Sequence, residues 1–381
     1  MPGNRCTRGE FLRTALLGGL MLAAPGTATP QTANKPRRPN FVVVLSDDHC
    51  HRAVGHNTPA VKTPTLDRLA REGIVFDRAY AATPICAASR ASLLTGLFPQ
   101  QHGAIALDSG GFREKVVEQG SLPTLAHLLA RAGYDTAFCG KSHLGPPRDY
   151  GFAEGEEMTD PTDDETFAFA GRFIRARAAN PNPFFLWVAA RQPHIPLQPP
   201  EEWIGLYRDT EIPVDPNFRE APPDGSIYNQ GLPGEQYHRD SDSRNNYQGL
   251  PAGPPRNREQ IREFTRAYCA VVSRLDDQIG ALVGQLEEAG VRENTVIVYL
   301  SDNGYFLGNH GLGNKITMHE ESVRVPMLLC GPCVAKPGVR TRALISSLDI
   351  LPTLLDLAGV PVPAHLVGLS LTPVLGDPEK E

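Results

Sequence analysis

The chain has 381 residues, of which 41% are hydrophobic and 21% are charged, a composition typical of a globular protein. This length fits one large α/β domain or two smaller domains. The formal net charge of −6 and the lack of a long basic run argue against nucleic acid as a partner.

The first 28 residues are typical of an export signal peptide. Arginines flank the apolar run ALLGGLMLAA at 15–24, which is too short to cross a membrane. Small residues follow, so cleavage is expected after Ala28, with a linker at 29–38. The alternative is a buried or interfacial helix. We therefore expect a periplasmic or secreted protein with no stable membrane span.

Short apolar runs alternate with helical patterns along the chain. Runs rich in Val, Ile, Phe and Tyr indicate buried parallel strands at 40–45, 134–139, 183–190, 294–300 and 324–329. Helical patterns fit 64–72, 86–95, 121–132, 257–289 and 349–359. The alternation predicts an α/β fold, a doubly wound and mostly parallel sheet flanked by helices. Residues 195–256, rich in Pro, Gly, Asn and Asp, are expected to form an irregular insertion.

The cysteines give a separate prediction. Seven is an odd number, which leaves at least one thiol unpaired in an exported protein. The sequence CGPC at 330–333 looks like a redox site, but such a site needs a helix directly after it. Because Pro337 and Gly338 break any helix there, we expect a structural disulfide or two unreactive thiols.

Polar side chains directly follow four of the apolar runs. They are Asp47 and Asp48, Lys141 and His143, His194, and Asp302 and Asn303. Because the carboxyl ends of parallel strands meet at one edge of a sheet, these groups are expected in one crevice. Taken singly, the acidic residues could be caps or turn residues, the histidines ordinary loop residues and the lysine solvated. The repeated pattern of an apolar run followed by Ser-Asp-Asp or Ser-Asp-Asn favours a shared site.

The stretch PICAASRASLLTG at 84–96 raises a similar choice. Cys86 lies at the start of the predicted helix 86–95, and Arg90 follows one turn later on the same face. A helix N-terminus carries positive potential and can bind an anion. The alternative is a packed helix with a structural cysteine, since free cysteine is often buried.

The residue types predict a metal site and an anionic substrate. Three carboxylates and one amide are oxygen ligands that Ca²⁺ or Mg²⁺ prefers over Zn²⁺. Positive or titratable groups surround them: Arg90, Lys141, His143, His194 and, as a further candidate, Lys315. This charge indicates a sulfate or phosphate ester as substrate. Two histidines can act as acid and base in the two halves of a displacement.

The ordered set of motifs resembles the type I, formylglycine-dependent sulfatases of the alkaline phosphatase superfamily. The motifs are SDDH at 46–49, CAASRASLLTG at 86–96, GKSHLG at 140–145, QPHIP at 192–196, SDNG at 301–304 and GNKITMHEESVRVP at 313–326. The resemblance implies a sulfatase catalytic domain at 39–376, followed by a tail at 377–381. It also implies a sulfuric ester hydrolase that acts on a sulfated small molecule or carbohydrate.

The resemblance assigns a role to each site residue. Cys86 would be oxidised by a maturase to formylglycine, whose hydrated aldehyde is the nucleophile, and Arg90 would hold the modified side chain. Asp47, Asp48, Asp302, Asn303 and residue 86 would bind the cation, Ca²⁺ or Mg²⁺. Lys141 and Lys315 would grip the sulfate. His194 would protonate the leaving alcohol, and His143 would then remove the remaining hydroxyl proton and expel sulfate.

Two features depart from the family pattern. Ala88 replaces the proline of the common Cys-x-Pro-x-Arg motif, as in the variant tied to the anaerobic, radical-type maturase. The chain also ends soon after LVGLSLTPVLGD at 366–377, where the family continues into a smaller C-terminal subdomain. That subdomain is therefore expected to be missing or truncated. Two alternative functions stay open: a formylglycine-dependent phosphonate or phosphate ester hydrolase of the same superfamily, and a non-catalytic binding protein with unmodified Cys86.

Overall fold

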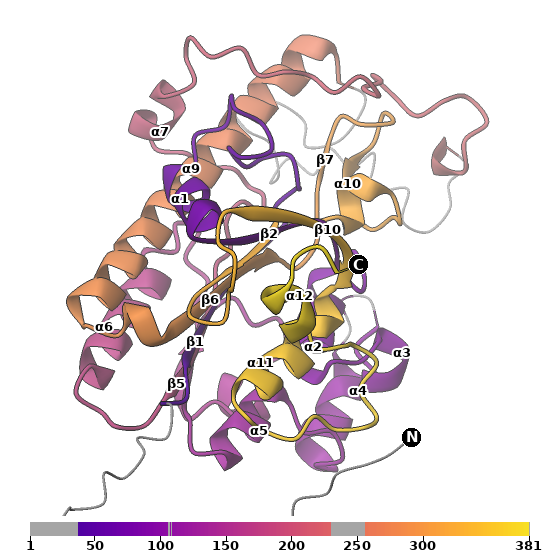
Figure 1. Ribbon diagram of the computed structural model, residues 1–381. Coiled ribbons are helices and arrows are strands. Elements are labelled where there is room, and N and C mark those ends of the chain that lie inside the picture. The colour runs from indigo at the N-terminus through magenta and orange to yellow at the C-terminus, as the bar shows by residue number, and fades with distance from the viewer. Residues whose placement is uncertain (1–36, 106, 108, 230–255, 381) are drawn as a thin grey trace, which may run out of the picture. The chain divides into compact units, whose positions relative to one another are not determined.

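The computed structural model describes residues 37–105, 107, 109–229 and 256–380. The predicted signal peptide, nearly all of the predicted linker and positions 230–255 of the predicted insertion lie outside the described residues. The described residues from Arg38 onward belong to one compact unit, Arg38–Glu381 (Figure 1).

An eight-stranded sheet forms the centre of this unit, with the order β10-β2-β9-β6-β1-β5-β3-β4. The strands are β1 (Asn40–Ser46), β2 (Gly73–Tyr80), β3 (Asp135–Gly140), β4 (Glu154–Glu157), β5 (Phe184–Ala189), β6 (Thr295–Ser301), β9 (Met327–Cys330) and β10 (Val339–Ser346). Every neighbouring pair is parallel except the two pairs that β9 makes with β2 and β6. The predicted mostly parallel sheet is confirmed.

The predicted direction of the strand at 324–329 is wrong, because β9 runs antiparallel to its neighbours. For β9 to run parallel to β6, the chain would need a long crossover connection back to the end of the sheet at which β6 begins. The chain between β6 and β9 instead forms only short elements, namely β7 (Phe306–Leu307), β8 (Gly313–Asn314) and α10 (Glu320–Val323). It therefore re-enters the sheet from the edge at which β6 ends.

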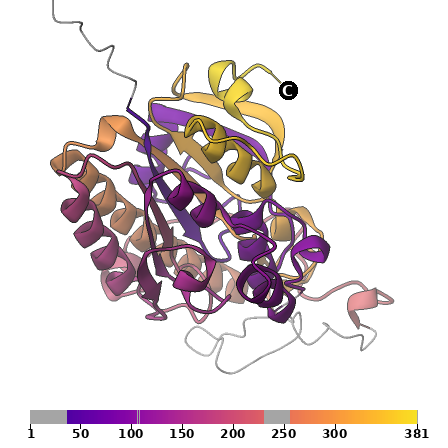
Figure 2. The ribbon, with the colours of Figure 1, turned by 90° about the horizontal axis from the view of Figure 1, so that it is seen from below.

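Helices cover both faces of the sheet, as Figure 2 shows. Along β1, Phe41, Val43 and Leu45 belong to one apolar cluster, whereas Val42 and Val44 belong to another. The first cluster includes residues of α2 (Cys86–Thr95), α5 (Leu125–Arg131) and α11 (Ile350–Leu357). The second includes residues of α1 (Pro64–Glu72), α6 (Asp164–Arg177) and α9 (Arg258–Glu288). Burial on both faces explains the continuous apolar runs of the central strands.

The predicted helices are present, with shifts at their ends. Helices α1 and α2 have the predicted bounds, and α9 lies within 257–289. Helix α5 begins later than predicted because Thr124 caps it, with its side chain accepting a hydrogen bond from the backbone N–H of His127. A 3-10 turn, η6 (Ser347–Asp349), precedes α11.

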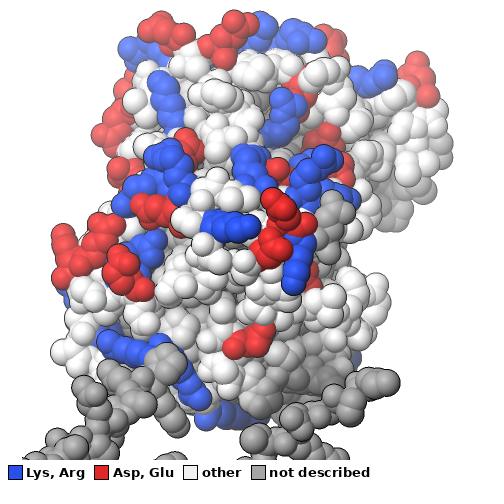
Figure 3. All heavy atoms as spheres, in the orientation of Figure 1, with Lys and Arg blue, Asp and Glu red and all other residues white. Residues whose placement is uncertain are grey.

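The remaining described helices are short: α3 (Pro99–His102), α4 (Gly110–Arg113), α7 (Glu201–Gly205) and α12 (Thr372–Gly376), with turns η1 (Glu114–Glu118), η2 (Pro147–Tyr150), η3 (Ile227–Asn229) and η5 (Arg292–Asn294). No described helix is both long enough and apolar enough to span a bilayer. On the face drawn in Figure 3, basic and acidic side chains are interspersed.

The described cysteines are free thiols, so Cys330 and Cys333 form no disulfide. Burial raises the pKa of Cys330 to about 11 and that of Cys333 to about 12. These two residues are therefore the pair of unreactive thiols that the sequence allowed.

Candidate active site

The acidic groups that follow β1 and β6 lie side by side. The two strands are in register up to Ser46 and Ser301, so the chain leaves the sheet at the same level in both. The backbone N–H of Asp48 donates to Asp302 Oδ1 at 3.2 Å, and Asn303 Nδ2 donates to Asp48 Oδ1 at 2.7 Å. All four side chains, Asp47 included, are buried. These residues therefore lie together, as the sequence predicted.

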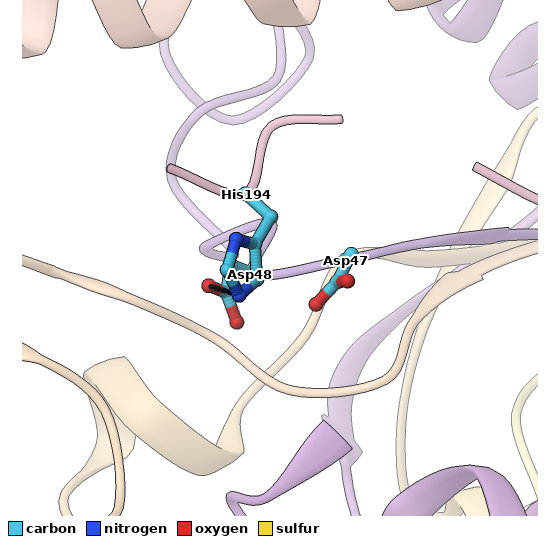
Figure 4. Close-up of side chains that lie close together, drawn as sticks. All are labelled: Asp47, Asp48 and His194. Carbon is cyan, nitrogen blue, oxygen red and sulfur yellow. Dashed lines mark ion pairs between the residues drawn. The ribbon is translucent and has the colours of Figure 1, made fainter. Parts of the chain in front are cut away.

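His194 joins this group from the loop after β5. The backbone N–H of Asp47 donates to the Gln192 carbonyl at 3.2 Å, which ties the two loops together. His194 Nε2 is 3.6 Å from Asp48 Oδ2, and Figure 4 shows the imidazole beside that carboxylate. Asp47, Asp48 and His194 each offer one ligand atom, and these atoms lie within 4.8 Å of one another.

Three buried oxygens in this group lack a hydrogen-bond partner: Asp47 Oδ1, Asp48 Oδ2 and Asn303 Oδ1. Leaving a buried polar atom unpaired costs roughly 1–3 kcal/mol. A divalent cation with oxygen ligands would satisfy all three, and carboxylate and amide oxygens are the donors that Ca²⁺ and Mg²⁺ take. The donor set therefore fits the Ca²⁺ or Mg²⁺ that the sequence predicts.

Three basic side chains contact the carboxylates. Lys141, directly after β3, pairs with Asp47, and Lys315 pairs with Asp48. Arg90 Nε donates to Asp302 Oδ2 at 2.8 Å, and Arg90 Nη2 is 3.4 Å from Asp47 Oδ2. The arginine on the same helix face as Cys86 therefore contacts the carboxylates.

The carboxylates of Asp47 and Asp302 are perturbed in opposite directions. Burial would raise the pKa of Asp47, but the positive charges of Lys141, His194 and Arg90 outweigh it and hold that pKa well below its usual range. Burial, together with the neighbouring Asp47, raises the pKa of Asp302 to about 7. The surrounding positive charges thus favour the ionised form of Asp47, whereas burial favours the protonated form of Asp302.

Cys86 begins α2, which is buried along its whole length and whose side chains are small or apolar except that of Arg90. Gly96 ends the helix with φ of +68°, a conformation that L side chains rarely adopt. The Cys86 side chain is 2% exposed, and its Sγ is 3.2 Å from His143 Nδ1. Burial raises the pKa of the thiol, so the unmodified side chain is a protonated, weak nucleophile at neutral pH.

The two histidines lie on different sides of the site. His143 is beside Cys86, whereas His194 is beside Asp48. The Ile195 carbonyl accepts from His194 Nδ1, which leaves Nε2 facing the carboxylate. Burial is the main cause that lowers the pKa of each imidazole to about 4.

A pocket of about 360 Å³ opens over these groups and is lined by Cys86, Lys141, His143, His194 and Lys315. Two further lining residues, Glu157 and Arg191, were missed from the sequence. Glu157 lies in a short strand without apolar residues, so no periodicity marked it. Arg191 directly precedes the Gln-Pro-His motif, and its place after a buried strand could have identified it.

Comparison with known proteins identifies the relatives of this chain. A family model described as Sulfatase matches residues 39–360. The chain is 30% identical to N-acetylglucosamine-6-O-sulfatase of Bacteroides thetaiotaomicron, over 95% of this chain and 75% of that protein. It is 28% identical to the ulvan-active sulfatase of Formosa agariphila, over 93% of this chain and 68% of that protein.

Solved structures agree. A protein in complex with its substrate D-glucosamine-2-N,6-O-disulfate matches with a TM-score of 0.73 and 27% identity, over 89% of this chain and 80% of that one. Phosphonate monoester hydrolase of Agrobacterium radiobacter has the same TM-score at 21% identity, over 90% and 78% of the two chains, and shares the fold. The chain belongs to the sulfatase family and is a sulfuric ester hydrolase.

Proposed function

We propose that this protein hydrolyses a sulfate ester of a carbohydrate, with residue 86 as the nucleophile after Cys86 is converted to formylglycine. One observation carries the proposal: Cys86 Sγ faces the pocket 3.2 Å from His143 Nδ1, beside Lys141, Lys315 and His194. The carbohydrate substrate is supported by the relatives named N-acetylglucosamine-6-O-sulfatase and ulvan-active sulfatase.

The proposed mechanism needs a bound cation and a formylglycine at position 86. Asp47, Asp48, Asp302 and Asn303 would hold Ca²⁺ or Mg²⁺, which supplies positive charge toward the sulfate oxygens. Formylglycine supplies, as its hydrate, the hydroxyl oxygen that attacks sulfur. We infer that an anaerobic-type maturase makes it, because Ala88 stands where the common motif has proline.

Lys141 and Lys315 would bind the sulfate oxygens. Both ammonium groups line the pocket, and both already contact the carboxylates that would hold the cation. Bound to the sulfate oxygens, they would orient the ester so that its sulfur faces residue 86. Positive groups fixed in a buried pocket also stabilise negative charge more strongly than the same groups in water.

His194 would give a proton to the ester oxygen as the sulfur–oxygen bond breaks. Its ring is fixed by the hydrogen bond from Nδ1 to the Ile195 carbonyl, so Nε2 is the atom that faces the pocket. A bound sulfate ester brings negative charge that favours the protonated imidazole. His143, next to residue 86, would then take the proton whose removal releases sulfate.

The proposal is tested by measuring sulfate release from N-acetylglucosamine 6-sulfate and 4-nitrophenyl sulfate, and hydrolysis of a phenylphosphonate monoester. The protein should be made together with an anaerobic-type maturase and supplied with Ca²⁺. We expect turnover of both sulfate esters, and a loss of at least about 10³-fold in Cys86→Ala, because that variant has no nucleophile.

Cys333→Ala is the matched control, since Cys333 is another free thiol and does not line the pocket. It should keep wild-type activity. Sulfate release that persists in Cys86→Ala, or a preference for the phosphonate ester over both sulfates, would overturn the proposal.

A further inference from the structure

Among the residues that the structure describes, one cationic side chain of the pocket, that of Arg191, has no acidic partner. Lys141 and Lys315, the two lysines that line it, pair with Asp47 and Asp48. Arg191 also lines the pocket, and among the described residues no carboxylate lies within ion-pair distance of its guanidinium. Its side-chain hydrogen bond runs from Nη2 to the Ile195 carbonyl at 3.3 Å.

That carbonyl fixes where the guanidinium lies. The same Ile195 oxygen accepts a hydrogen bond from His194 Nδ1, so Arg191 and His194 converge on one atom. His194 is the residue proposed to protonate the leaving alcohol. Arg191 therefore lies on the His194 side of the pocket, whereas Lys141 and Lys315 contact the proposed ligands of the cation.

The backbone of Arg191 is also held in place. The Asp163 side chain accepts from the backbone N–H of Arg191 at 2.8 Å and from that of Gln192 at 2.9 Å. Asp163 is buried, so this anchor is sheltered from water. A residue anchored in this way loses little freedom when a ligand binds, which favours affinity.

The acidic side chain that lines the same pocket is already engaged. Glu157 Oε1 accepts from the backbone N–H groups of Ser142 and His143, each at 3.0 Å. The guanidinium of Arg191 presents a planar set of donors that matches the two oxygens of a carboxylate or sulfate. Among the described residues that line the pocket, Arg191 is thus a cation without an acidic partner, and it lies next to His194.

We propose that Arg191 binds a second anionic substituent, a sulfate or a carboxylate, on the alcohol half of the substrate. The preferred substrates are then sugars that carry the scissile sulfate ester and one further negative group. This inference rests on the proposed function and deepens it by naming the substrate class.

The test measures affinity on Cys86→Ala protein by calorimetry in Ca²⁺ buffer, so that it does not depend on turnover. The ligands are N-acetylglucosamine 6-sulfate, glucosamine-2-N,6-O-disulfate, and a monosulfated uronic acid. We expect at least one of the two dianionic sugars to bind about 10- to 100-fold more tightly than the monosulfate, as expected for a charged hydrogen-bonded pair.

Adding Arg191→Gln should remove that preference and leave the affinity for the monosulfate unchanged. His194 Nδ1 makes its own hydrogen bond to the Ile195 carbonyl, so His194 keeps that support while the charge of Arg191 is lost. Arg191→Lys should retain part of the preference. If Arg191→Gln removes only the preference for the disulfate, the second group is a sulfate. If it removes only the preference for the uronate, the second group is a carboxylate.

Arg208→Gln is the matched control, because Arg208 is 70% exposed and pairs with Glu201 at the surface. It should change neither affinity. Two results would overturn the inference. One is equal affinity of all three ligands for the protein that retains Arg191, and the other is an equal loss of affinity for all three in Arg191→Gln. Failure of the proposed function would instead appear as absent sulfate release from protein that retains Cys86.

Discussion

His143 and His194 have similar pKa values but different surroundings, and this difference separates their proposed roles. His143 Nδ1 faces Cys86, the proposed nucleophile position. His194 Nε2 faces Asp48, and its Nδ1 is bound to a backbone carbonyl that Arg191 also contacts. In the proposed mechanism, a proton held at Nε2 of His194 goes to the departing oxygen, whereas His143 acts on residue 86.

The proposed role of His194 makes its importance depend on the leaving group. His194→Ala should lower kcat by about 10²–10⁴-fold for a sugar sulfate, whose alcohol needs a proton to depart. The loss should be much smaller for 4-nitrophenyl sulfate, because nitrophenolate leaves without a proton. Measuring kcat for both substrates in each variant gives the comparison.

His143→Ala should show the opposite pattern, with a burst of nitrophenolate followed by slow turnover. His365→Ala, at an exposed position outside the pocket, is the control and should match wild type. The division of roles is wrong if both variants show the same leaving-group dependence and neither gives a burst.

Individual site residues differ in how well the sequence located them. Asp47, Asp48, Asp302 and Asn303 follow buried strands, and their position at the sheet edge followed from that alone. The pairing of Asp47 and Asp48 with lysines depends on how loops pack, which no local pattern specifies. Arg90 was predicted on the face of Cys86, yet its hydrogen bonds go to Asp302 and to the Lys141 carbonyl.

Among the secondary structure elements, the short edge strand β4 supports the His143 loop. It pairs with β3 so that Glu157 lies opposite Gly140, one residue before Lys141. From there Glu157 accepts from two backbone N–H groups of the loop, including that of His143, whose φ is +62°. A non-glycine residue in this conformation costs roughly 1–3 kcal/mol and needs such support.

We therefore expect Glu157→Ala to lower kcat by about tenfold on both sugar and nitrophenyl sulfates, with a burst like that of His143→Ala. The loss of one charged hydrogen-bond acceptor is of this size. Glu157→Gln should restore kcat, since its amide oxygen accepts the same two hydrogen bonds. The measurement is pre-steady-state release of nitrophenolate. Partial unfolding would lower the amount of active protein but would not produce a burst.

Glu156→Ala, at the exposed neighbouring position of β4, provides the reference. A wild-type kcat in Glu157→Ala would contradict the positioning role, and so would a Glu157→Gln protein as slow as Glu157→Ala.

The strands that the sequence predicted are buried along nearly their whole length. Strands β1, β5 and β6 are buried at every residue, and their apolar runs identified them. Strand β4, with the sequence EGEE, is exposed throughout and gave no signal. Strand β10 lies at the other edge of the sheet, and its alternation of arginines with apolar residues was not recognised.

For the whole molecule, the proposed cation site joins two neighbouring strands of the central sheet. Its acidic ligands come from the ends of β1 and β6, which are separated by about two thirds of the chain but hydrogen-bonded in register. A cation bound only by the folded protein stabilises it by about 2.7 kcal/mol at a concentration of 100 times Kd.

Ca²⁺ should accordingly raise the midpoint of thermal unfolding, and a chelator should lower it. Asp302→Asn should lose most of this response, because one carboxylate of the site is removed. Asp209→Asn, at an exposed position, should respond as wild type. Differential scanning calorimetry with and without Ca²⁺ measures the shift, and an equal response in Asp302→Asn and wild type would contradict the assignment.

The sequence predicted the fold class and the shared crevice, because buried strands appear as apolar runs and the residues at their ends can be read directly from the sequence. The walls of the pocket were not predictable in the same way. Arg191 and Glu157 reach it from the ends of β5 and β4, and their relevance depends on where β4 pairs with β3.

Whether residue 86 is the nucleophile is decided by the mass of the tryptic peptide that spans 79–90, AYAATPICAASR. The measurement uses protein made with the anaerobic-type maturase. We predict an aldehyde in place of the Cys86 thiol, in a fraction that rises in proportion to the specific activity for sulfate release across preparations. Full sulfatase activity in protein whose residue 86 is entirely unmodified cysteine would contradict this mechanism.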